Sequence, residues 1–504
     1  MPHSETDAEK IARLERENEQ LRQEIERLRH ELEKALRAGK RQAAPFSRNA
    51  PKTNPRKPGR KAGRCYGRKG HRAVPPRVDE TLEAELPLNC PDCGGGVTET
   101  EVVDQYQTEI PRPQLHYVQF RVHVGCCRQC GQSVQGRHPR QTSAALGSAA
   151  SQLGPRAVAL ATQLNKGLGL PYGKTAQVLK DGWGLEVTRG GICQAIARAA
   201  RKAEPTYQRM VQQLRASAMV TADETGWRVA AQSWWLWAFA TPAMTVYSIQ
   251  PGRGFEQAAA VLGADFSGQL VRDGWIAYLR FTQAVHQTCL THLITRSVEM
   301  MAVSTPAAAR FPQAVKTILQ AALRLRDRRD GGAISPHGLT VARGRLEAKL
   351  DGLLAGSYRW PDNERFANHL YRERNYIFTF LYYPGLDAAN WRGEQAVRPA
   401  VVTRKVWGGN RTPCGAHTQE ILASVLRTCC QQGREWQALL IELLCSPKPK
   451  RLNLIADLPP PRRSATSPSP PRQAAGLAPE PDRWMPWNYH ATLLPAAVAF
   501  GLAA

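Results

Sequence analysis

The sequence has no long hydrophobic run. Its longest apolar stretch, LLPAAVAFGLAA at residues 493–504, is too short to cross a bilayer. The first ten residues, MPHSETDAEK, are acidic and polar, so no signal peptide is expected. The basic residues do not fall on an obvious amphipathic helix, which makes a membrane surface a weak partner. We therefore expect a cytoplasmic, nucleoid-associated protein with no membrane partner.

Acidic residues are too few to balance the basic ones. The sequence has 68 Lys and Arg against 43 Asp and Glu, which gives a formal net charge of +25. Such an excess predicts attraction to polyanions and says nothing about the fold. Nucleic acid is the leading candidate partner, because its dense phosphates would use that much charge.

The twelve cysteines lack the spacing of a secreted disulfide framework, so a reducing compartment with thiols and a metal site is expected. Two Cys-x-x-Cys pairs, Cys90 with Cys93 and Cys127 with Cys130, can form a tetrahedral thiolate site that suits structural Zn²⁺. The stretch YVQFRVHV between them alternates like a strand. These features predict a zinc ribbon over residues 77–140 with an elongated hairpin. Unrelated buried thiols are the weaker alternative.

Residues 8–37 carry a heptad repeat that predicts a parallel coiled-coil dimer. Isoleucine at a with leucine at d favours two strands, and a single asparagine at a fixes the register. Glu17 and Glu24 at g would face Arg22 and Arg29 of a partner helix. We expect a homodimer or a higher homo-oligomer; a lone solvated helix is the alternative. The a positions are Ile11, Asn18, Ile25 and Leu32, and the d positions are Leu14, Leu21, Leu28 and Ala35.

Residues 38–76 are expected to form a basic arm that is disordered by itself. No acidic residue occurs between 37 and 72, and proline and glycine are interleaved, as in NPRKPGRKAGR. Such a segment cannot bury a core. A DNA-binding arm and a solubilising linker are both open, and the absence of acids favours DNA. The residues expected to contact DNA here are Arg56, Lys57, Arg60, Lys61 and Arg64.

Residues 150–206 read as three short helices separated by Gly and Pro, with Thr188 as the N-cap of the third. A helix, a turn and a basic helix suggest a helix-turn-helix-like DNA-binding segment. A plain helical linker domain is the alternative. At the other end, residues 447–504 are expected to form a disordered tail, because their first forty residues are rich in Pro, Ser and Arg.

The chain is expected to be a multidomain α/β protein. Its α/β core is expected at residues 215–446. Three strands separated by turns are followed by a fourth, in GQLVRDGWIAY, which is expected to end at Asp273. A helix that contains CLTHLITR comes next, and further helices follow it. This order predicts a ribonuclease-H-like catalytic core with a helical insertion at about 300–378. A later short helix is expected to be capped by Asn390 and ended by Pro399. The first three strands are expected at 218–229, 233–241 and 243–250.

In a ribonuclease-H-like sheet the first and fourth strands are neighbours, so Asp223 and Asp273 would lie side by side. Glu394 on the late helix could close the cluster. Crowded carboxylates are unfavourable without a cation, and hard oxygen ligands suit Mg²⁺ or Mn²⁺. Glu224 should point to the opposite face as a solvated or paired charge. Glu420 is the first alternative if Glu394 is not the third acid.

Several motifs together resemble the transposases of the insertion sequence 66 type (the TnpC proteins) in the DDE superfamily. They are the zipper, the basic GRKAGR…GRKGH arm, the paired Cys knuckles, ADETGW, RDGWIAY, CLTH and NWRGEQAVRPAVVTRKVWGGNRT. The resemblance covers residue 8 to about 446. It implies that Asp223, Asp273 and Glu394 are the catalytic acids and that a 3′-OH is released and joined to target DNA. Where the family usually has NNxxER, this chain has NWRGEQ.

The remaining candidates near the acids are less specific. Cys289 and His292 in CLTH lie one helical turn apart and can bind a metal, but packing or orienting the helix is favoured. Arg398, Arg404 and Lys405 can contact DNA phosphates or form a solvated face. A catalytically inactive DNA-binding regulator and a nuclease without strand transfer are the rival functions. Accessory transposition proteins are possible further partners.

Overall fold

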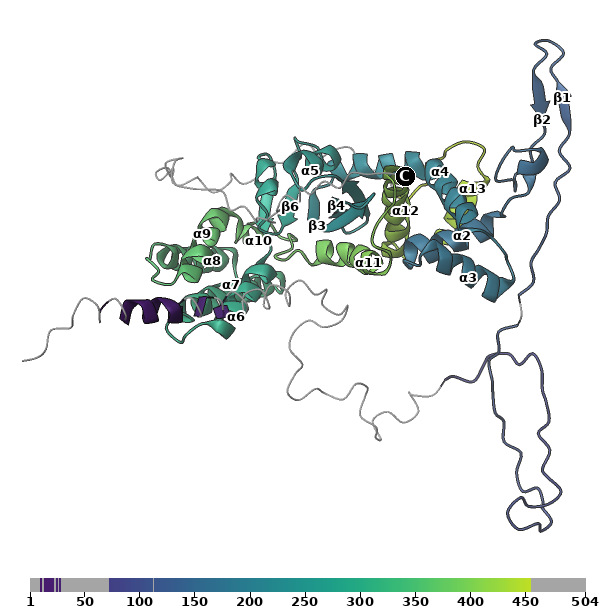
Figure 1. Cartoon of the computed structure of the whole chain (residues 1–504), viewed down its shortest axis with the longest axis horizontal. Coiled ribbons are helices and arrows are strands. Elements are labelled where there is room, and N and C mark those ends of the chain that lie inside the picture. Colours follow the sequence, from purple (N-terminus) through teal and green to yellow (C-terminus); the bar gives the residue numbers. More distant parts are fainter. Residues whose placement is uncertain are drawn as a thin grey trace, which may run out of the picture. The chain divides into compact units, whose positions relative to one another are not determined.

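The structure is a computed structural model that describes residues 10, 13–21, 24–25, 27–28, 72–111 and 113–454. Figure 1 shows the order of its elements along the chain. The five predicted DNA contacts between Arg56 and Arg64, and the tail from residue 455, lie outside these residues. In the part that the structure describes, no helix is long and apolar enough to cross a membrane.

A five-stranded mixed sheet lies at the centre of the α/β region. Its order is β5-β4-β3-β6-β7, with β3, β4 and β5 antiparallel and with β6 and β7 parallel to β3. The prediction that the first and fourth strands are neighbours is confirmed by the β3–β6 pairing. The strands are β3 (Met219–Val229), β4 (Gln232–Ala240), β5 (Thr245–Gln250), β6 (Gln269–Arg272) and β7 (Val285–Thr288).

The fourth strand, which was expected to end at Asp273, is one residue shorter. It ends at Arg272, and Ile276–Arg280 form a 3₁₀-helix, η4. The strand β7 was not expected at all, because VHQT has neither a β-branched run nor an apolar alternation. Its pairing with β6 buries these polar residues, so tertiary context decides this strand rather than local propensity.

The two faces of the sheet are covered by different helices. Along β3, Val220 and Ala222 face one hydrophobic cluster, whereas Trp227 and Val229 face another. The second cluster includes Ala396, Val397 and Ala400 of α11 (Trp391–Trp407), which packs on β3 and β4. Odd-numbered residues of β3 therefore point toward α11 and even-numbered residues point away from it.

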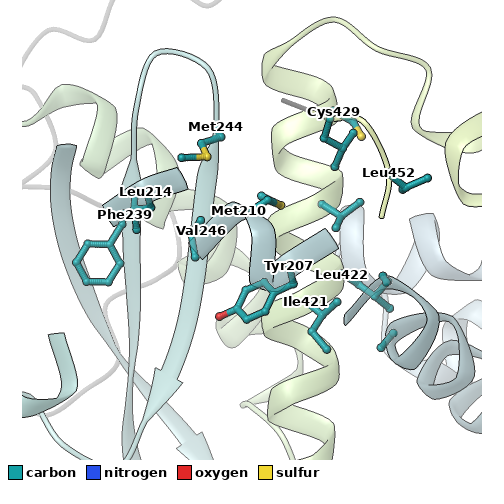
Figure 2. Close-up of a cluster of buried hydrophobic side chains, with 14 of the residues drawn as sticks. Tyr207, Met210, Leu214, Phe239, Met244, Val246, Ile421, Leu422, Cys429 and Leu452 are labelled. Carbon is teal, nitrogen blue, oxygen red and sulfur yellow. The ribbon is translucent and has the colours of Figure 1, made fainter. Parts of the chain in front are cut away.

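The larger cluster joins the sheet to the helices on its other side. Figure 2 shows Phe239 and Val246 of the sheet, Tyr207 and Met210 of α4, and residues of α12 meeting in one apolar core. Thr188 caps α4 as predicted, since its hydroxyl accepts from the Gly191 N–H at 3.0 Å. The helices here are α2 (Pro155–Thr162), the π-helical turn η3 (Gln163–Gly167), α3 (Tyr172–Trp183), α4 (Arg189–Arg215), α5 (Phe255–Leu262), α12 (Pro413–Gln431) and α13 (Trp436–Cys445).

The start of the expected disordered tail is ordered, which corrects that prediction for residues 450–454. Leu452 and Leu454 are buried in the larger cluster. The Leu452 N–H donates to the Thr206 hydroxyl of α4 at 2.9 Å. Two leucines in a polar, proline-rich context gave no periodic signal, but α4 offers them an apolar surface.

A separate helical cluster follows β7. Val271 of β6 and buried residues of α6, α7, α9 and α10 share one apolar core, which includes Phe311, Phe366 and Phe380. The first of these helices begins at Leu290, immediately after the sheet, where the helix containing CLTHLITR was expected. The helices are α6 (Leu290–Val303), α7 (Arg310–Asp330), α8 (Pro336–Leu354), α9 (Pro361–Glu373), η5 (Arg374–Tyr376) and α10 (Thr379–Tyr382).

Helix α12 covers the outer edge of β5 with polar side chains. Thr428 and Ser424 accept the backbone N–H groups of Thr245 and Tyr247 at 3.1 and 2.9 Å, and Glu420 accepts that of Ile249. The three acceptors are four residues apart on the helix, which is an advance of about 6 Å along its axis. The three donors are two residues apart on the strand, which is about 6.7 Å, so each acceptor can reach its own donor. These bonds satisfy donors that an exposed edge strand would leave unpaired.

The described residues between 72 and 150 contain little regular structure. A short hairpin pairs β1 (Val124–Cys126) with β2 (Ser133–Gln135), so the strand expected at 117–124 begins only where that stretch ends. Residues 13–21 are helical, and Leu14 is 51% exposed and Leu21 56% exposed. Such exposure is what the apolar seam of a coiled coil shows in a single helix without its partner. Glu24 pairs within its own helix, with Arg27 at 2.5 Å.

Candidate active site

The sheet brings two of the predicted acids together. The β3–β6 register pairs Thr221 with Val271, and continuing it by two residues sets Asp223 opposite Asp273 where β6 ends. Each carboxylate accepts one nearby backbone N–H through Oδ1: Asp223 from Glu224 and Asp273 from Trp275, both at 2.9 Å. Among the described residues nothing donates a hydrogen bond to the second oxygen of either carboxylate, so that oxygen can bind another ligand.

Electrostatics show how crowded this corner is. Burial, followed by the negative charges of Glu224 and Asp273, raises the pKa of Asp223 to about 7. In the described part of the chain, neither Asp223 nor Asp273 forms an ion pair with lysine or arginine. A cation bound between these two carboxylates would relieve their repulsion.

Glu224 has the opposite surroundings, although it is adjacent in sequence. It is 8% exposed, and its Oε1 lies 2.7 Å from Nε and 2.5 Å from Nη2 of Arg253. Its Oε2 accepts from the Tyr278 hydroxyl at 2.5 Å. The prediction that Glu224 is a paired charge on the other face of the sheet is therefore confirmed, with two partners that the sequence did not identify.

The Arg253 side chain is itself held by aromatic rings. Its guanidinium carbon lies 3.9 Å from the ring centre of Trp275 and 4.7 Å from that of Trp235. The Trp275 indole N–H donates to the Arg253 carbonyl at 3.0 Å. This arrangement fixes the turn after Asp273 against the turn that follows β5.

Glu394 lies in the first turn of α11, with a side chain 45% exposed. Asn390 is at the N-cap position as predicted, but its side chain makes no capping bond. The expected end at Pro399 is wrong, because α11 continues to Trp407. Pro399 is exposed, and the buried Ala396 and Ala400 pack both halves of the helix on the sheet.

One further group surrounds Glu394. The ligand atoms of Cys289, His292 and Glu394 all lie within 4.8 Å of one another, and among the described residues this is the group of three that can hold a metal ion. His292 Nδ1 is 3.7 Å from Glu394 Oε1. A hydrogen bond with Cys289, together with the charges of Glu394 and Asp273, raises the pKa of His292 to about 9. Sequence reasoning paired Cys289 with His292 and missed their acidic neighbour.

The alternative third acid, Glu420, is used elsewhere. Its carboxylate accepts from the Ile249 N–H on the β5 edge and lies 2.8 Å from His417 Nδ1. The strand β5 is two strands away from β3, on the side opposite β6. Glu420 therefore serves α12 and the sheet edge, whereas Glu394 lies beside His292.

The three basic residues of α11 differ in their surroundings. Arg404 is half-buried, and its Nη1 donates to the Thr225 hydroxyl at 3.1 Å and to the Gly226 carbonyl. This guanidinium fastens α11 to β3, so it does not belong to a solvated face. Arg398 and Lys405 are exposed on the same helix.

Both cysteine knuckles have the same local geometry. Gly94 and Gly131, each with a positive φ, donate their N–H groups to the Cys90 and Cys127 carbonyls at 2.8 and 2.9 Å. Hydrogen bonds from backbone N–H groups lower the pKa of the thiols of Cys90 and Cys127, which favours the thiolates that zinc requires. The structure forms each knuckle but does not gather three of the four sulfur atoms into one group.

Comparison with known proteins gives two findings. The family model described as "Transposase IS66 family" matches residues 150–418, a span that contains the sheet and all three predicted acids. The Uncharacterized protein y4qI of Sinorhizobium fredii (strain NBRC 101917 / NGR234) is 25% identical over 405 residues, which cover 73% of this chain and 71% of that protein.

Proposed function

This chain belongs to the IS66 transposase family, and from that membership we propose that it is a DDE-type DNA transposase. It binds the ends of its element as double-stranded DNA, cleaves a strand to release a 3′-OH and joins that end to target DNA. The observation that carries the proposal is the corner where Asp223 and Asp273 meet. Among the described residues the two crowded carboxylates there form no ion pair with lysine or arginine, whereas their neighbour Glu224 pairs with Arg253 and accepts from the Tyr278 hydroxyl.

Three acids are proposed as ligands of catalytic Mg²⁺ or Mn²⁺. Asp223 and Asp273 offer the oxygens that their backbone N–H bonds leave open, and Glu394 approaches from α11. These are hard oxygen donors of the kind that Mg²⁺ prefers. When bound, the ions supply activation of water or a 3′-hydroxyl and stabilisation of the leaving oxygen. The protein brings Asp223 and Asp273 to neighbouring strands and keeps Arg253 on the other side of the sheet.

The sheet topology supports the proposal of a ribonuclease-H-like core, because three antiparallel strands, β3 to β5, are followed by β6 and β7, which are parallel to β3. The other segments are assigned proposed roles around it. The helix at 8–37 makes a homodimer, the arm at 38–76 and the segment at 150–206 bind DNA, and the ribbon at 77–140 holds one structural Zn²⁺. Arg398 and Lys405 are placed to meet DNA phosphates from the exposed side of α11.

The test is cleavage and joining of labelled DNA that carries the element's ends, by the full chain with Mg²⁺. Asp223→Asn, Asp273→Asn and Glu394→Gln should each bind DNA and abolish both steps, because the acids act as one unit. Glu256→Gln is the matched control, since Glu256 pairs with Arg280 on the surface. Binding without any cleavage by the unaltered chain would favour the inactive regulator, and cleavage without joining would favour a nuclease.

A further inference from the structure

Two buried residues outside the set of acids, Cys289 and Asn390, lie where the three acid-bearing elements meet. Both are fully buried. Cys289 directly precedes α6, and Asn390 directly precedes α11. The backbone N–H of Asn390 donates to the Cys289 sulfur at 3.1 Å, which joins the starts of the two helices.

Each of these residues also bonds to the residue that precedes one aspartate. The side-chain amide of Asn390 donates to the carbonyl of Ala222 at 2.8 Å, directly before Asp223. The backbone N–H of Cys289 donates to the carbonyl of Arg272 at 2.9 Å, directly before Asp273. The two bonds therefore hold the backbone immediately before both acids.

The third acid is tied to the same pair. The Glu394 N–H donates to the Asn390 carbonyl at 3.0 Å, in the first turn of α11. Gly393 leaves room for this arrangement, because a Cβ there would lie 2.5 Å from Asn390 Oδ1. A parallel bond from the Leu290 N–H to the Ala388 carbonyl, at 3.0 Å, strengthens the junction between the two helix starts.

We propose that Asn390, with Cys289, is the positioning residue that holds Asp223, Asp273 and Glu394 in the arrangement needed for the divalent cation. This inference rests on the proposed function of these acids. The Asn390 side chain uses its N–H donor for this purpose. Its Oδ1 has no hydrogen-bond partner among the described residues. Neither residue is one of the three proposed ligands of the divalent cation, and both reach the acids through backbone groups.

The test is the Mg²⁺ dependence of DNA cleavage by the full chain. Asn390→Ala removes the amide that holds the Ala222 carbonyl, and we expect at least a tenfold rise in the Mg²⁺ concentration for half-maximal cleavage. Mn²⁺, which tolerates looser geometry, should restore part of the rate. The matched control is Asn363→Ala, because buried Asn363 makes the same kind of bond, to the Ala308 carbonyl at 2.9 Å, within the helical cluster. It should lower thermal stability and leave the Mg²⁺ requirement unchanged.

Cys289 provides a second test if the Asn390 variant does not fold. Cys289→Ser keeps an acceptor for the Asn390 N–H and should stay within about threefold of the unaltered Mg²⁺ requirement, whereas Cys289→Ala should raise it further. Equal Mg²⁺ requirements for folded Asn390→Ala and the unaltered chain, or for the serine and alanine variants, would overturn the proposal.

Direct Mn²⁺ binding, followed by electron paramagnetic resonance, separates this inference from the proposed function. If Asp223→Asn still cleaves DNA, the assignment of the acids fails. If Asp223→Asn is inactive and Asn390→Ala binds Mn²⁺ as the unaltered chain does, only the positioning role fails.

Discussion

Replacing Glu373 by glutamine should destabilise this protein far more than the same change at a surface glutamate. Glu373 Oε2 lies 2.7 Å from Arg272 Nη1, and the two side chains are 3% and 0% exposed. The Thr288 hydroxyl donates to the same oxygen. Removing one partner of a buried pair leaves an uncompensated charge and costs about 3–5 kcal/mol.

Thermal unfolding of the purified chain measures this loss. For a domain of about 150–250 residues, a loss of 1 kcal/mol lowers Tm by about 2–4 °C. A loss of about 3 kcal/mol, the lower end of the expected range, should therefore lower the Tm of Glu373→Gln by roughly 6–12 °C. Glu256→Gln is the control, because Glu256 and Arg280 are 66% and 61% exposed at 2.6 Å. An exposed pair contributes only about 0.2–1 kcal/mol. A drop for Glu373→Gln no larger than that for Glu256→Gln would refute the reasoning.

The Arg272–Glu373 pair also contacts the candidate active site, because Arg272 Nη1 donates to the Asp273 carbonyl at 2.8 Å. Arg272→Met combined with Glu373→Met removes both charges, and most of the lost stability should return. Cleavage should nevertheless remain low, because the Asp273 carbonyl has lost its donor. Recovery of both stability and cleavage in the double variant would show that the pair serves folding alone.

Three further predictions concern other parts of the chain. A hydrogen bond with Glu420 and the charge of a second glutamate raise the pKa of His417 from 6.5 to about 9. The contribution of protonated His417 to the stability of the fold should therefore be full below pH 6.5 and be lost as the pH rises through 9. His417→Gln should abolish this part of the pH dependence of Tm. Ser424→Ala leaves the buried Tyr247 N–H without its acceptor and should cost about 1–3 kcal/mol in chemical denaturation. Cys93→Ala should remove one zinc per chain in elemental analysis and unfold the ribbon, whereas unchanged zinc would exclude that site.

Local sequence signals located many features of the fold. The alternation in VTADETGWRV predicted a strand that places Asp223 and Glu224 on opposite faces, and the structure confirms it. Thr188 was recognisable as an N-cap, because its hydroxyl serves donors only three residues away. Such features depend on neighbours in the chain, so they can be read from the sequence.

Other features have partners that are distant in the chain, and local sequence patterns were misleading or absent for them. Proline normally ends a helix, yet α11 passes Pro399 because its apolar side packs on β3 and β4. The polar strand β7 exists because β6 offers a free edge. Leu452 is ordered because α4 presents an apolar surface and the Thr206 hydroxyl.

The sequence alone determined that two aspartates, fifty residues apart, end up at neighbouring strands, because strand order follows from the succession of elements. Tertiary structure alone decided that the surroundings of these aspartates differ from those of Glu224, which forms an ion pair with Arg253 and accepts a hydrogen bond from Tyr278. It also decided that Asn390 holds Ala222 and Cys289 rather than capping its own helix. Burial and hydrogen-bond geometry set these roles, and both depend on which distant segments pack together, which no local pattern specifies.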